Sequence, residues 1–303
     1  MKSLVYHAGA LGDFVTILPA LSCWRQSHLG EQIILWGRPP HGQLAMAASL
    51  VDEVRDIAKA EFARCFSEKL DEELSAALRE FNSALLFTRP DSLLARNLSL
   101  AGIRDIRLQP PFPDRPVPVV SYHLSLLEPF EAPQNPEDPC LDFRHRLLEK
   151  TGGPIFLPAR VLFHPGSGSP AKNWPSENFV YLAEEIKRKG IEIGWLAGPA
   201  EENWPSPFSD PLLRCPDLVE LARVLAGASL FVGNDSGTSH LAAAMGCPTV
   251  AIFLDSDPIV WAPQGKKVRV IDLRTTREGN SKATRYSILE TCLTMLAEID
   301  RGG

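Results

Sequence analysis

The sequence predicts an α/β protein made of two doubly wound halves, each a parallel sheet covered by helices. Short apolar runs alternate with amphipathic ones along the 303 residues, which is the pattern of β-α-β units. A proline-rich stretch from 110 to 139 interrupts this alternation, which restarts near residue 160. We therefore predict two domains, 1–150 and 151–303, with ligands bound in the cleft between them at the carboxyl ends of the strands.

In the first half, short runs predict strands, and apolar residues at helical spacing predict helices. The predicted strands are 3–6, 32–36, 84–87 and 104–107, and the predicted helices are 14–28, 71–81 and 92–101. Prolines remove backbone donors and end helices. The proline-rich stretch is therefore predicted to be irregular around one helix at 121–127, and the domain boundary is placed at 151–154.

The second half repeats the same alternation. The predicted strands are 160–163, 192–196, 230–232, 249–253 and 268–271, and the predicted helices are 176–189, 218–226, 236–245 and 287–299. Each strand is followed by a helix or by a turn that contains glycine and polar residues. The turns that could hold a ligand are therefore expected at one edge of each sheet.

Composition excludes several classes of protein. With 45% hydrophobic and 22% charged residues, the chain is typical of a soluble globular protein. Its net charge of -6 argues against a nucleic-acid binder. Six scattered cysteines without a C-x-x-C pair predict reduced thiols and no metal site. No run approaches the ~20 apolar residues of a membrane span, and Asp13 interrupts the apolar N-terminus, so no signal peptide is expected.

The segment Gly233–Ala244, G-N-D-S-G-T-S-H-L-A-A-A, is the most informative of the polar turns. It lies between two apolar runs and predicts a strand, a tight polar turn and a helix. The N-terminus of a helix presents unpaired N–H groups and the positive end of the helix dipole, which suits a phosphate. Asp235 or Ser236 could instead be an ordinary cap for those groups.

Three further turns follow predicted strands. In His7–Asp13, Asp13 is either a helix cap or a carboxylate that acts as general base. In His164–Pro175, Lys172 and the backbone and hydroxyl donors of 166–169 could bind an anion, although the loop is not a P-loop. In Leu196–Glu202, the carboxylates could accept hydrogen bonds from ribose hydroxyls.

Together these stretches resemble the ADP-heptose:lipopolysaccharide heptosyltransferase family, glycosyltransferase family 9. The matching runs are A-L-G-D-F-V, H-P-G-S-G-S-P-A-K-N-W-P, L-A-G-P-A-E, V-G-N-D-S-G-T-S-H-L-A-A-A-M-G-C-P-T-V and W-A-P-Q-G. The resemblance implies a GT-B fold, with two Rossmann-like domains and a last helix that crosses back onto the N-terminal domain. It also implies inverting, metal-independent sugar transfer, with an acceptor-binding N-terminal domain and a donor-binding C-terminal domain.

The resemblance implies roles for individual residues as well. Asp13 matches the general base, and Gly12 beside it lies on the acceptor side. The residues that match the donor site are Gly166, Ser167, Gly168, Ser169, Lys172, Glu201, Asp235, Ser236, Gly237 and His240. The donor would be ADP-heptose or a similar nucleotide sugar, with no metal and no further cofactor. The expected partner is a glycolipid or lipopolysaccharide-core acceptor, met by a cytoplasmic enzyme that contacts the inner face of the inner membrane peripherally.

One stretch departs from the family. Where family members usually continue Phe-Gly-Pro-Thr-Asp-Pro, this chain has Phe253-Leu-Asp-Ser-Asp-Pro258. The departure lies near the expected sugar pocket and leaves the transferred sugar open. Two alternatives therefore remain: a non-catalytic nucleotide-sugar-binding protein, and an epimerase or hydrolase of UDP-sugars on the same fold.

Overall fold

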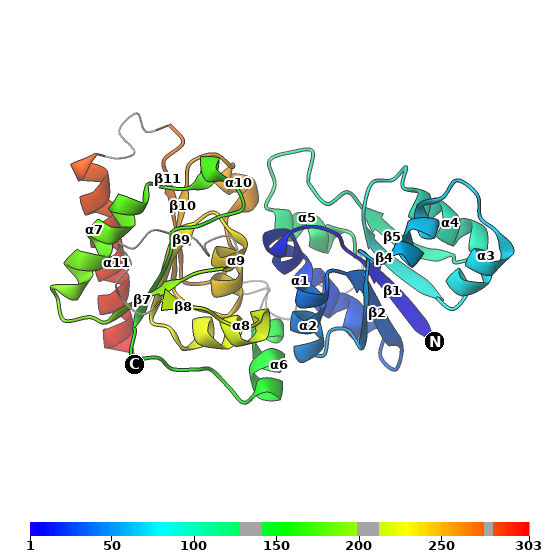
Figure 1. Cartoon of the computed structure of the whole chain (residues 1–303), viewed down its shortest axis with the longest axis horizontal. Coiled ribbons are helices and arrows are strands. Elements are labelled where there is room, and N and C mark those ends of the chain that lie inside the picture. Colours follow the sequence, from blue (N-terminus) through cyan, green and yellow to red (C-terminus); the bar gives the residue numbers. More distant parts are fainter. Residues whose placement is uncertain (128–140, 199–211, 276–280, 303) are drawn as a thin grey trace. The chain divides into compact units, whose positions relative to one another are not determined.

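The chain divides into two units. The first comprises Met1–Pro136 and His145–Thr151, and the second comprises Glu137–Arg144 and Gly152–Gly303. The computed structural model describes residues 1–127, 141–198, 212–275 and 281–302 (Figure 1). Each unit contains its own parallel sheet. These two parallel sheets confirm the predicted α/β class.

The first unit is built on a five-stranded sheet in the order β3-β2-β1-β4-β5. Its strands are β1 (Lys2–Tyr6), β2 (Gln32–Gly37), β3 (Glu53–Asp56), β4 (Ser83–Phe87) and β5 (Asp105–Gln109). Its helices are α1 (Leu11–Ser27), α2 (Pro39–Ala47), α3 (Glu72–Leu78), α4 (Leu93–Ala101) and α5 (Val119–Ser125), with a 3-10 turn, η1, at Ala60–Phe66. The order reverses direction between β1 and β4, which is where doubly wound sheets bind ligands.

The helices of the first unit cover both faces of its sheet. Alternate strand residues such as Leu4, Ile34 and Leu86 are buried against η1, α3 and α4. Figure 1 shows α1, α2 and α5 on the opposite face. Because both faces are covered, the central strands β1, β2 and β4 are buried on both faces beyond their first residues and are largely apolar, instead of alternating with polar residues.

The second unit is built on a six-stranded sheet in the order β11-β10-β9-β6-β7-β8. Its strands are β6 (Val161–His164), β7 (Ile193–Leu196), β8 (Leu212–Leu213), β9 (Leu230–Asn234), β10 (Thr249–Phe253) and β11 (Val268–Asp272). Its helices are α7 (Ser176–Lys187), α8 (Leu218–Gly227), α9 (Gly237–Ala244), α10 (Pro258–Trp261) and α11 (Lys282–Gly302), with a 3-10 turn, η2, at Pro170–Lys172. The strand order of this sheet reverses between β6 and β9.

Helix α6 (Leu141–Thr151) is divided between the two units, with His145–Thr151 assigned to the first and the residues up to Arg144 to the second. Arg144 donates from Nε to the carbonyl oxygen of Met245, at the end of α9, over 2.7 Å. No helix was predicted over these residues, which adjoin the proline-rich stretch.

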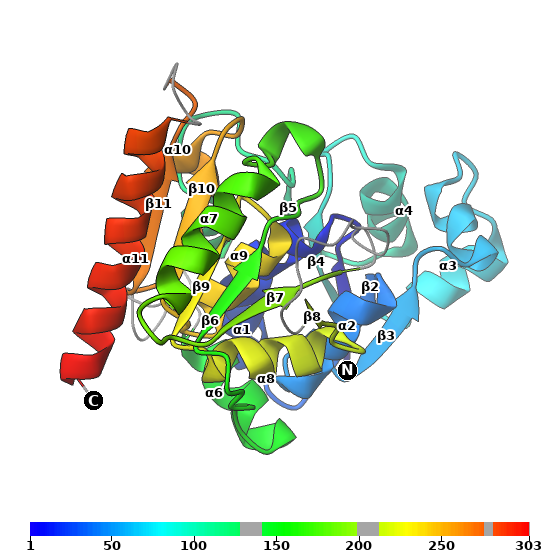
Figure 2. The same ribbon diagram turned by 60° about the vertical axis from the view of Figure 1, so that its left-hand side comes forward.

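The last helix, α11, packs within the second unit. Ile288, Cys292 and Leu296 are buried in the same apolar cluster as Phe179 of α7 and Val232 of β9. Figures 1 and 2 both show α11 (red) beside α7 (green). The structure thus assigns α11 to the second unit, and its expected crossing onto the N-terminal domain stays a prediction.

Of the six cysteines, the five that lie in the described ranges are free thiols: Cys23, Cys65, Cys215, Cys247 and Cys292. Among the residues that the structure describes, no helix combines the length and the apolar character needed to cross a membrane.

Candidate functional site

The loops after β6 and β9 leave the second sheet at its switch point, where the two strands pair in parallel. Asn234, the last residue of β9, joins these loops to each other. Its Nδ2 donates to the carbonyl oxygen of Pro165 over 2.6 Å, and its Oδ1 accepts from the backbone N–H of Trp174 over 3.0 Å. Asn234 is fully buried. Both ends of the 165–174 loop are thereby tied to β9.

The 165–174 loop is also bonded internally. The Ser167 hydroxyl lies 2.6 Å from Oδ1 of Asn173 and 2.7 Å from the carbonyl oxygen of Ser169, and it accepts from the Ser169 N–H. Gly166 and Gly168 flank Ser167. A methyl group on Gly168 would meet nothing within 4 Å. The loop is therefore ordered by its own serine and asparagine, with open space beside Gly168.

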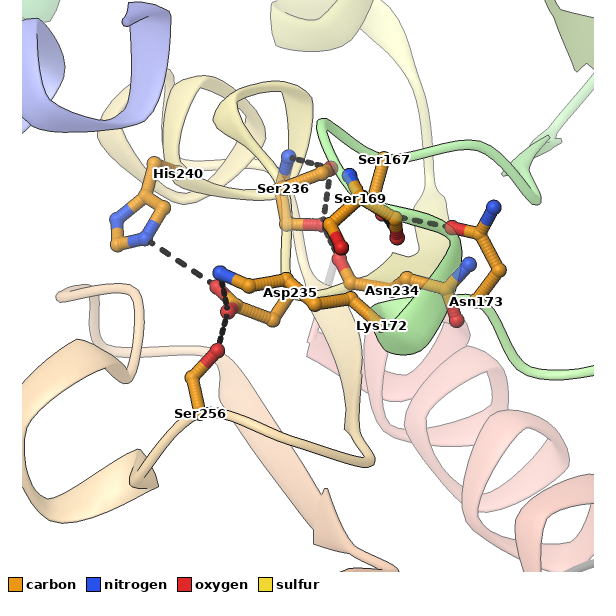
Figure 3. A network of polar contacts seen from close by, with 10 residues as sticks. Ser167, Ser169, Lys172, Asn173, Asn234, Asp235, Ser236, His240 and Ser256 are labelled. Atoms are coloured by element: carbon orange, nitrogen blue, oxygen red, sulfur yellow. Dashed lines mark hydrogen bonds and ion pairs between the residues drawn. The ribbon is translucent and has the colours of Figure 1, made fainter. Parts of the chain in front are cut away.

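The Asp235 carboxylate is the centre of the polar network in Figure 3. Its Oδ2 lies 2.7 Å from Nζ of Lys172 and also accepts from the Ser256 hydroxyl. Its Oδ1 lies 3.9 Å from Nε2 of His240. The Asp235 side chain is 5% exposed and the Lys172 side chain 32% exposed. A buried carboxylate thus meets a partly exposed ammonium group from the other loop.

The imidazole of His240 is uncharged near neutral pH. Burial lowers its pKa from 6.5 to about 4; the Asp235 charge opposes this shift and the Lys172 charge adds to it. The group is therefore a dipole beside Asp235 and not a second cation. Lys172 supplies the positive side-chain charge of this network.

Helix α9 begins in the same place. Its N-cap is Ser236, whose Oγ accepts from the N–H of Ser239 over 3.3 Å, and Gly237 is its first residue. The Ser239 hydroxyl donates to the carbonyl oxygen of Asn234. Ser236 therefore acts as an ordinary cap, and it directs the N-terminal end of the helix dipole to the same turn as Asp235.

Asp13 lies in the first unit, in the turn after β1. It is the third residue of α1, which begins earlier than predicted, and Gly12 precedes it in the same turn. Its Oδ2 accepts from the backbone N–H of Ala10 over 3.1 Å. The side chain is thereby held in the turn at the switch point between β1 and β4.

A cluster of three histidines, His7, His41 and His123, lies in the same unit and was not identified from the sequence. The ring of Phe14 contacts His7 and His41, and the ring of Phe87 contacts His7 and His123, with centroids 5.2–6.1 Å apart. The Nδ1 of each histidine is buried without a hydrogen-bond partner in the part of the chain that the structure describes. Burial is the main cause that lowers the pKa of His7 to about 3 and those of His41 and His123 to about 4.

The structure thus brings part of the predicted site together. The predicted residues that follow β6 and β9 at the switch point of the second unit are Gly166, Ser167, Gly168, Ser169, Lys172, Asp235, Ser236, Gly237 and His240. Figure 3 shows six of them close together: Ser167, Ser169, Lys172, Asp235, Ser236 and His240. Asp13 and Gly12 belong to the first unit, and Glu201 lies outside the described residues. Sequence reasoning missed Asn234 and Ser256 as members of the network. Within the described ranges, no group of three or more histidine, cysteine or acidic side chains is arranged to hold a metal ion.

A family model described as glycosyltransferase family 9 (heptosyltransferase) matches residues 113–290, more than half of the chain. The chain belongs to glycosyltransferase family 9. Lipopolysaccharide heptosyltransferase 1 of Escherichia coli K12 is 32% identical over 126 residues, 39% of each protein. Lipopolysaccharide heptosyltransferase 2 of Salmonella typhimurium is 33% identical over 126 residues, 37% of this chain and 36% of that protein. The match therefore spans less than two fifths of these relatives' length.

Solved glycosyltransferase structures share the fold over almost the whole chain. The Escherichia coli heptosyltransferase WaaC with ADP has a TM-score of 0.72 and 20% identity, over 97% of this chain and all of that one. The family 9 glycosyltransferase of Veillonella parvula DSM 2008 has a TM-score of 0.72 and 17% identity, over 98% and 97% of the two chains. The fold is therefore that of the GT-B heptosyltransferases.

Proposed function

We propose that this family 9 member is an inverting, metal-independent glycosyltransferase that moves heptose from ADP-heptose to an acceptor hydroxyl. The observation that carries the proposal is the Lys172–Asp235 pair beside the N-terminus of α9, at the switch point of the second sheet. A cation and a helix N-terminus attract a diphosphate, and a carboxylate can accept hydrogen bonds from sugar hydroxyls. Relatives named as heptosyltransferases, one of them solved with ADP, support the choice of donor.

In the proposed reaction, Asp13 takes the proton of the acceptor hydroxyl. The acceptor oxygen forms a bond to the anomeric carbon from the face opposite the diphosphate, the bond from that carbon to the phosphate oxygen breaks, and the configuration inverts. ADP leaves with the electron pair and with the negative charge that develops on its terminal phosphate. Lys172 and the α9 N-terminus stabilise this charge, which is the role that a metal ion has in other transferases.

The acceptor is proposed to be a lipopolysaccharide core or a related surface glycan, because the similar curated proteins are named lipopolysaccharide heptosyltransferases. We assign acceptor binding to residues 1–150 and donor binding to residues 151–303, with Glu201 at the donor ribose. The reaction is proposed to take place in the cytoplasm, at the inner face of the inner membrane.

Transfer from ADP-heptose to a heptose-deficient core acceptor tests this proposal, with a panel of other nucleotide sugars in parallel. Asp13→Asn should lower kcat at least ~100-fold while ADP affinity is kept, because the base is lost and the donor site is not. Asp91→Asn, a change of an exposed aspartate, is the control. A fully active Asp13→Asn enzyme would overturn the assignment of the base.

Incubation without acceptor separates the proposed transfer from its alternatives. A hydrolase or an epimerase converts the nucleotide sugar when it is alone, whereas a transferase needs the acceptor for efficient turnover. Tight binding of ADP-heptose without turnover on any acceptor would instead indicate a nucleotide-sugar-binding protein.

A further inference from the structure

Two donors share one oxygen of Asp235. Lys172 reaches Oδ2 from the 165–174 loop, and Ser256 reaches the same atom from the segment after β10. Figure 3 also joins His240 to this carboxylate, with its Nε2 3.9 Å from Oδ1. Asp235 itself is fixed, since its backbone N–H donates to the carbonyl oxygen of Ile252 over 2.9 Å.

Ser256 is held firmly from both sides. On its N-terminal side, the chain comes from β10, whose residues are all buried in the core of the sheet. On its C-terminal side, the next residue is Asp257, which is the N-cap of α10. The Asp257 carboxylate accepts a hydrogen bond from the N–H of Ile259 and lies 3.3 Å from the Arg274 guanidinium. Arg274 is fixed in turn by two hydrogen bonds to Asp272 at the end of β11. The backbone that carries the Ser256 hydroxyl is thus set by contacts that involve neither Lys172 nor Asp235.

In this state Lys172 is engaged by Asp235. A diphosphate that binds Lys172 competes with Asp235 for this ammonium group. A buried carboxylate that loses a charged donor destabilises the folded state unless another donor remains. His240 is uncharged and beyond hydrogen-bond distance, so the donor that remains on Oδ2 is Ser256.

We propose that Ser256 is a positioning residue that shares the Asp235 carboxylate with Lys172 and so lowers the cost of releasing Lys172 to an anionic ligand. The identity of that ligand, the diphosphate of a nucleotide sugar, rests on the proposed function. Two consequences follow. Without the Ser256 hydroxyl, Lys172 is held more tightly by Asp235, and without the Asp235 charge, the hydroxyl of Ser256 no longer affects Lys172.

The first test needs no nucleotide. Competitive acetylation with mass-spectrometric readout compares the reactivity of the Lys172 amine between variants of the full chain, because an amine held against a carboxylate acetylates more slowly than a free one. Ser256→Ala should slow acetylation of Lys172 roughly two- to tenfold, Ser256→Thr should restore it, and Asp235→Asn should speed it. Ser125→Ala is the matched control, since it removes one serine hydrogen bond, to Tyr122, in the other unit.

A double-mutant cycle makes the test decisive. If the inference is right, Ser256→Ala has no further effect on Lys172 once Asp235→Asn is present. Equal slowing in both backgrounds, or no slowing in Ser256→Ala, overturns it. The cycle also protects against a merely unstable variant, because general loosening would speed acetylation of Lys172 and not slow it.

Titration calorimetry with ADP then connects the inference to the proposed function. Ser256→Ala should weaken ADP binding by about tenfold, Ser256→Thr should not, and the effect should vanish in the Asp235→Asn background. A wild-type chain that binds no ADP would contradict the proposed function, yet the acetylation cycle would still decide the role of Ser256.

Discussion

At the scale of single residues, the cap contact of Asp13 is compatible with its proposed role as general base. The sequence left both interpretations of Asp13 open. Its Oδ2 caps the first turn of α1 through Ala10, and this contact fixes the direction of the carboxylate. A general base benefits from such fixation, because proton transfer needs the base within hydrogen-bond reach of the hydroxyl. The capping contact therefore supports the proposed base.

The space around Asp13 gives a prediction for Gly9. A methyl group at this position would lie 2.8 Å from Oδ2 of Asp13 and 2.9 Å from Cε1 of His7. Both distances are shorter than ordinary van der Waals contacts of a methyl carbon. Gly9→Ala should therefore displace the carboxylate and lower kcat roughly 100-fold, as misplacement of a catalytic group does. Steady-state kinetics and ADP titration check this prediction together. A parallel loss of ADP affinity would show that the change reaches beyond the Asp13 turn and would contradict it.

At the scale of elements, one asparagine joins the β6 loop to the end of β9. The side chain of Asn234 makes two buried hydrogen bonds, to Pro165 and Trp174. This contact orders the loop that carries Ser167 and Lys172. The position of the proposed phosphate-binding groups is therefore set by the sheet and not by the loop alone.

Asn234→Ala should lower the free energy of unfolding by about 2–4 kcal/mol, because two hydrogen bonds are lost and their buried backbone partners are left unsatisfied. ADP affinity should fall with it, as the loop loses its attachment. Urea unfolding and ADP titration measure the two effects. Asn82→Ala is the matched control: Asn82 is exposed, its Oδ1 accepts one hydrogen bond from Lys2, and less than about 1 kcal/mol should be lost. An equal loss in both variants would contradict the assigned role of Asn234.

The sequence predicted the central elements well, because a parallel strand buried on both faces is a continuous apolar run. It gave no sign of α2, where Pro39, Pro40 and Gly42 look like breakers. In the structure the prolines occupy the first turn of the helix, where their missing N–H is not needed. Strand β3 was also missed, since its sequence Glu-Val-Arg-Asp is that of a polar edge strand.

The candidate site was predictable where its residues follow strands in turns of glycine and polar residues. Lys172, Asp235 and His240 came from such turns, and the structure places them in one network. Ser256 was not predicted as a member, because it reaches Asp235 only through the folding of the segment after β10. The histidine cluster was missed for the same reason: its three members come from β1, α2 and α5 and meet only in the folded unit.

At the scale of the whole molecule, the two sheets repeat one arrangement with different chemistry. Each sheet reverses its strand order beside its first strand, and each proposed group follows a strand at that reversal. In the second unit the turn carries Lys172 and a helix N-terminus, which suit an anion. In the first unit the turn carries Asp13, and the three uncharged imidazoles of His7, His41 and His123 lie in the same unit. We therefore expect the two units to respond differently to acid.

Acid should destabilise the first unit through its histidine cluster. The pKa values of His7, His41 and His123 are lowered in the folded chain to about 3, 4 and 4, mainly by burial. Charges on His41, His123 and Arg38 add to the lowering of the His7 pKa, and the Arg38 charge adds to that of His41. Asp13 is the carboxylate beside His7. The unfolded chain binds protons at these histidines near pH 6.5 and the folded chain does not, so their contribution to stability is complete above pH 6.5 and is lost as the pH falls toward 4.

His123→Phe isolates one member of the cluster, because a phenyl ring can keep the edge contact with Phe87 and carries no proton. Each such histidine lowers the free energy of unfolding by about 1.4 kcal/mol for every pH unit below 6.5. Urea unfolding of the full chain, followed from pH 7.5 to pH 5, should therefore show little difference in slope above pH 6.5. Below pH 6.5 the slope of His123→Phe should become smaller by up to about 1.4 kcal/mol per pH unit. At pH 7.5 the same variant should not lose stability, because the substitution removes a buried Nδ1 that has no hydrogen-bond partner among the described residues. An unchanged slope would show that the cluster is already open to protons in the folded chain.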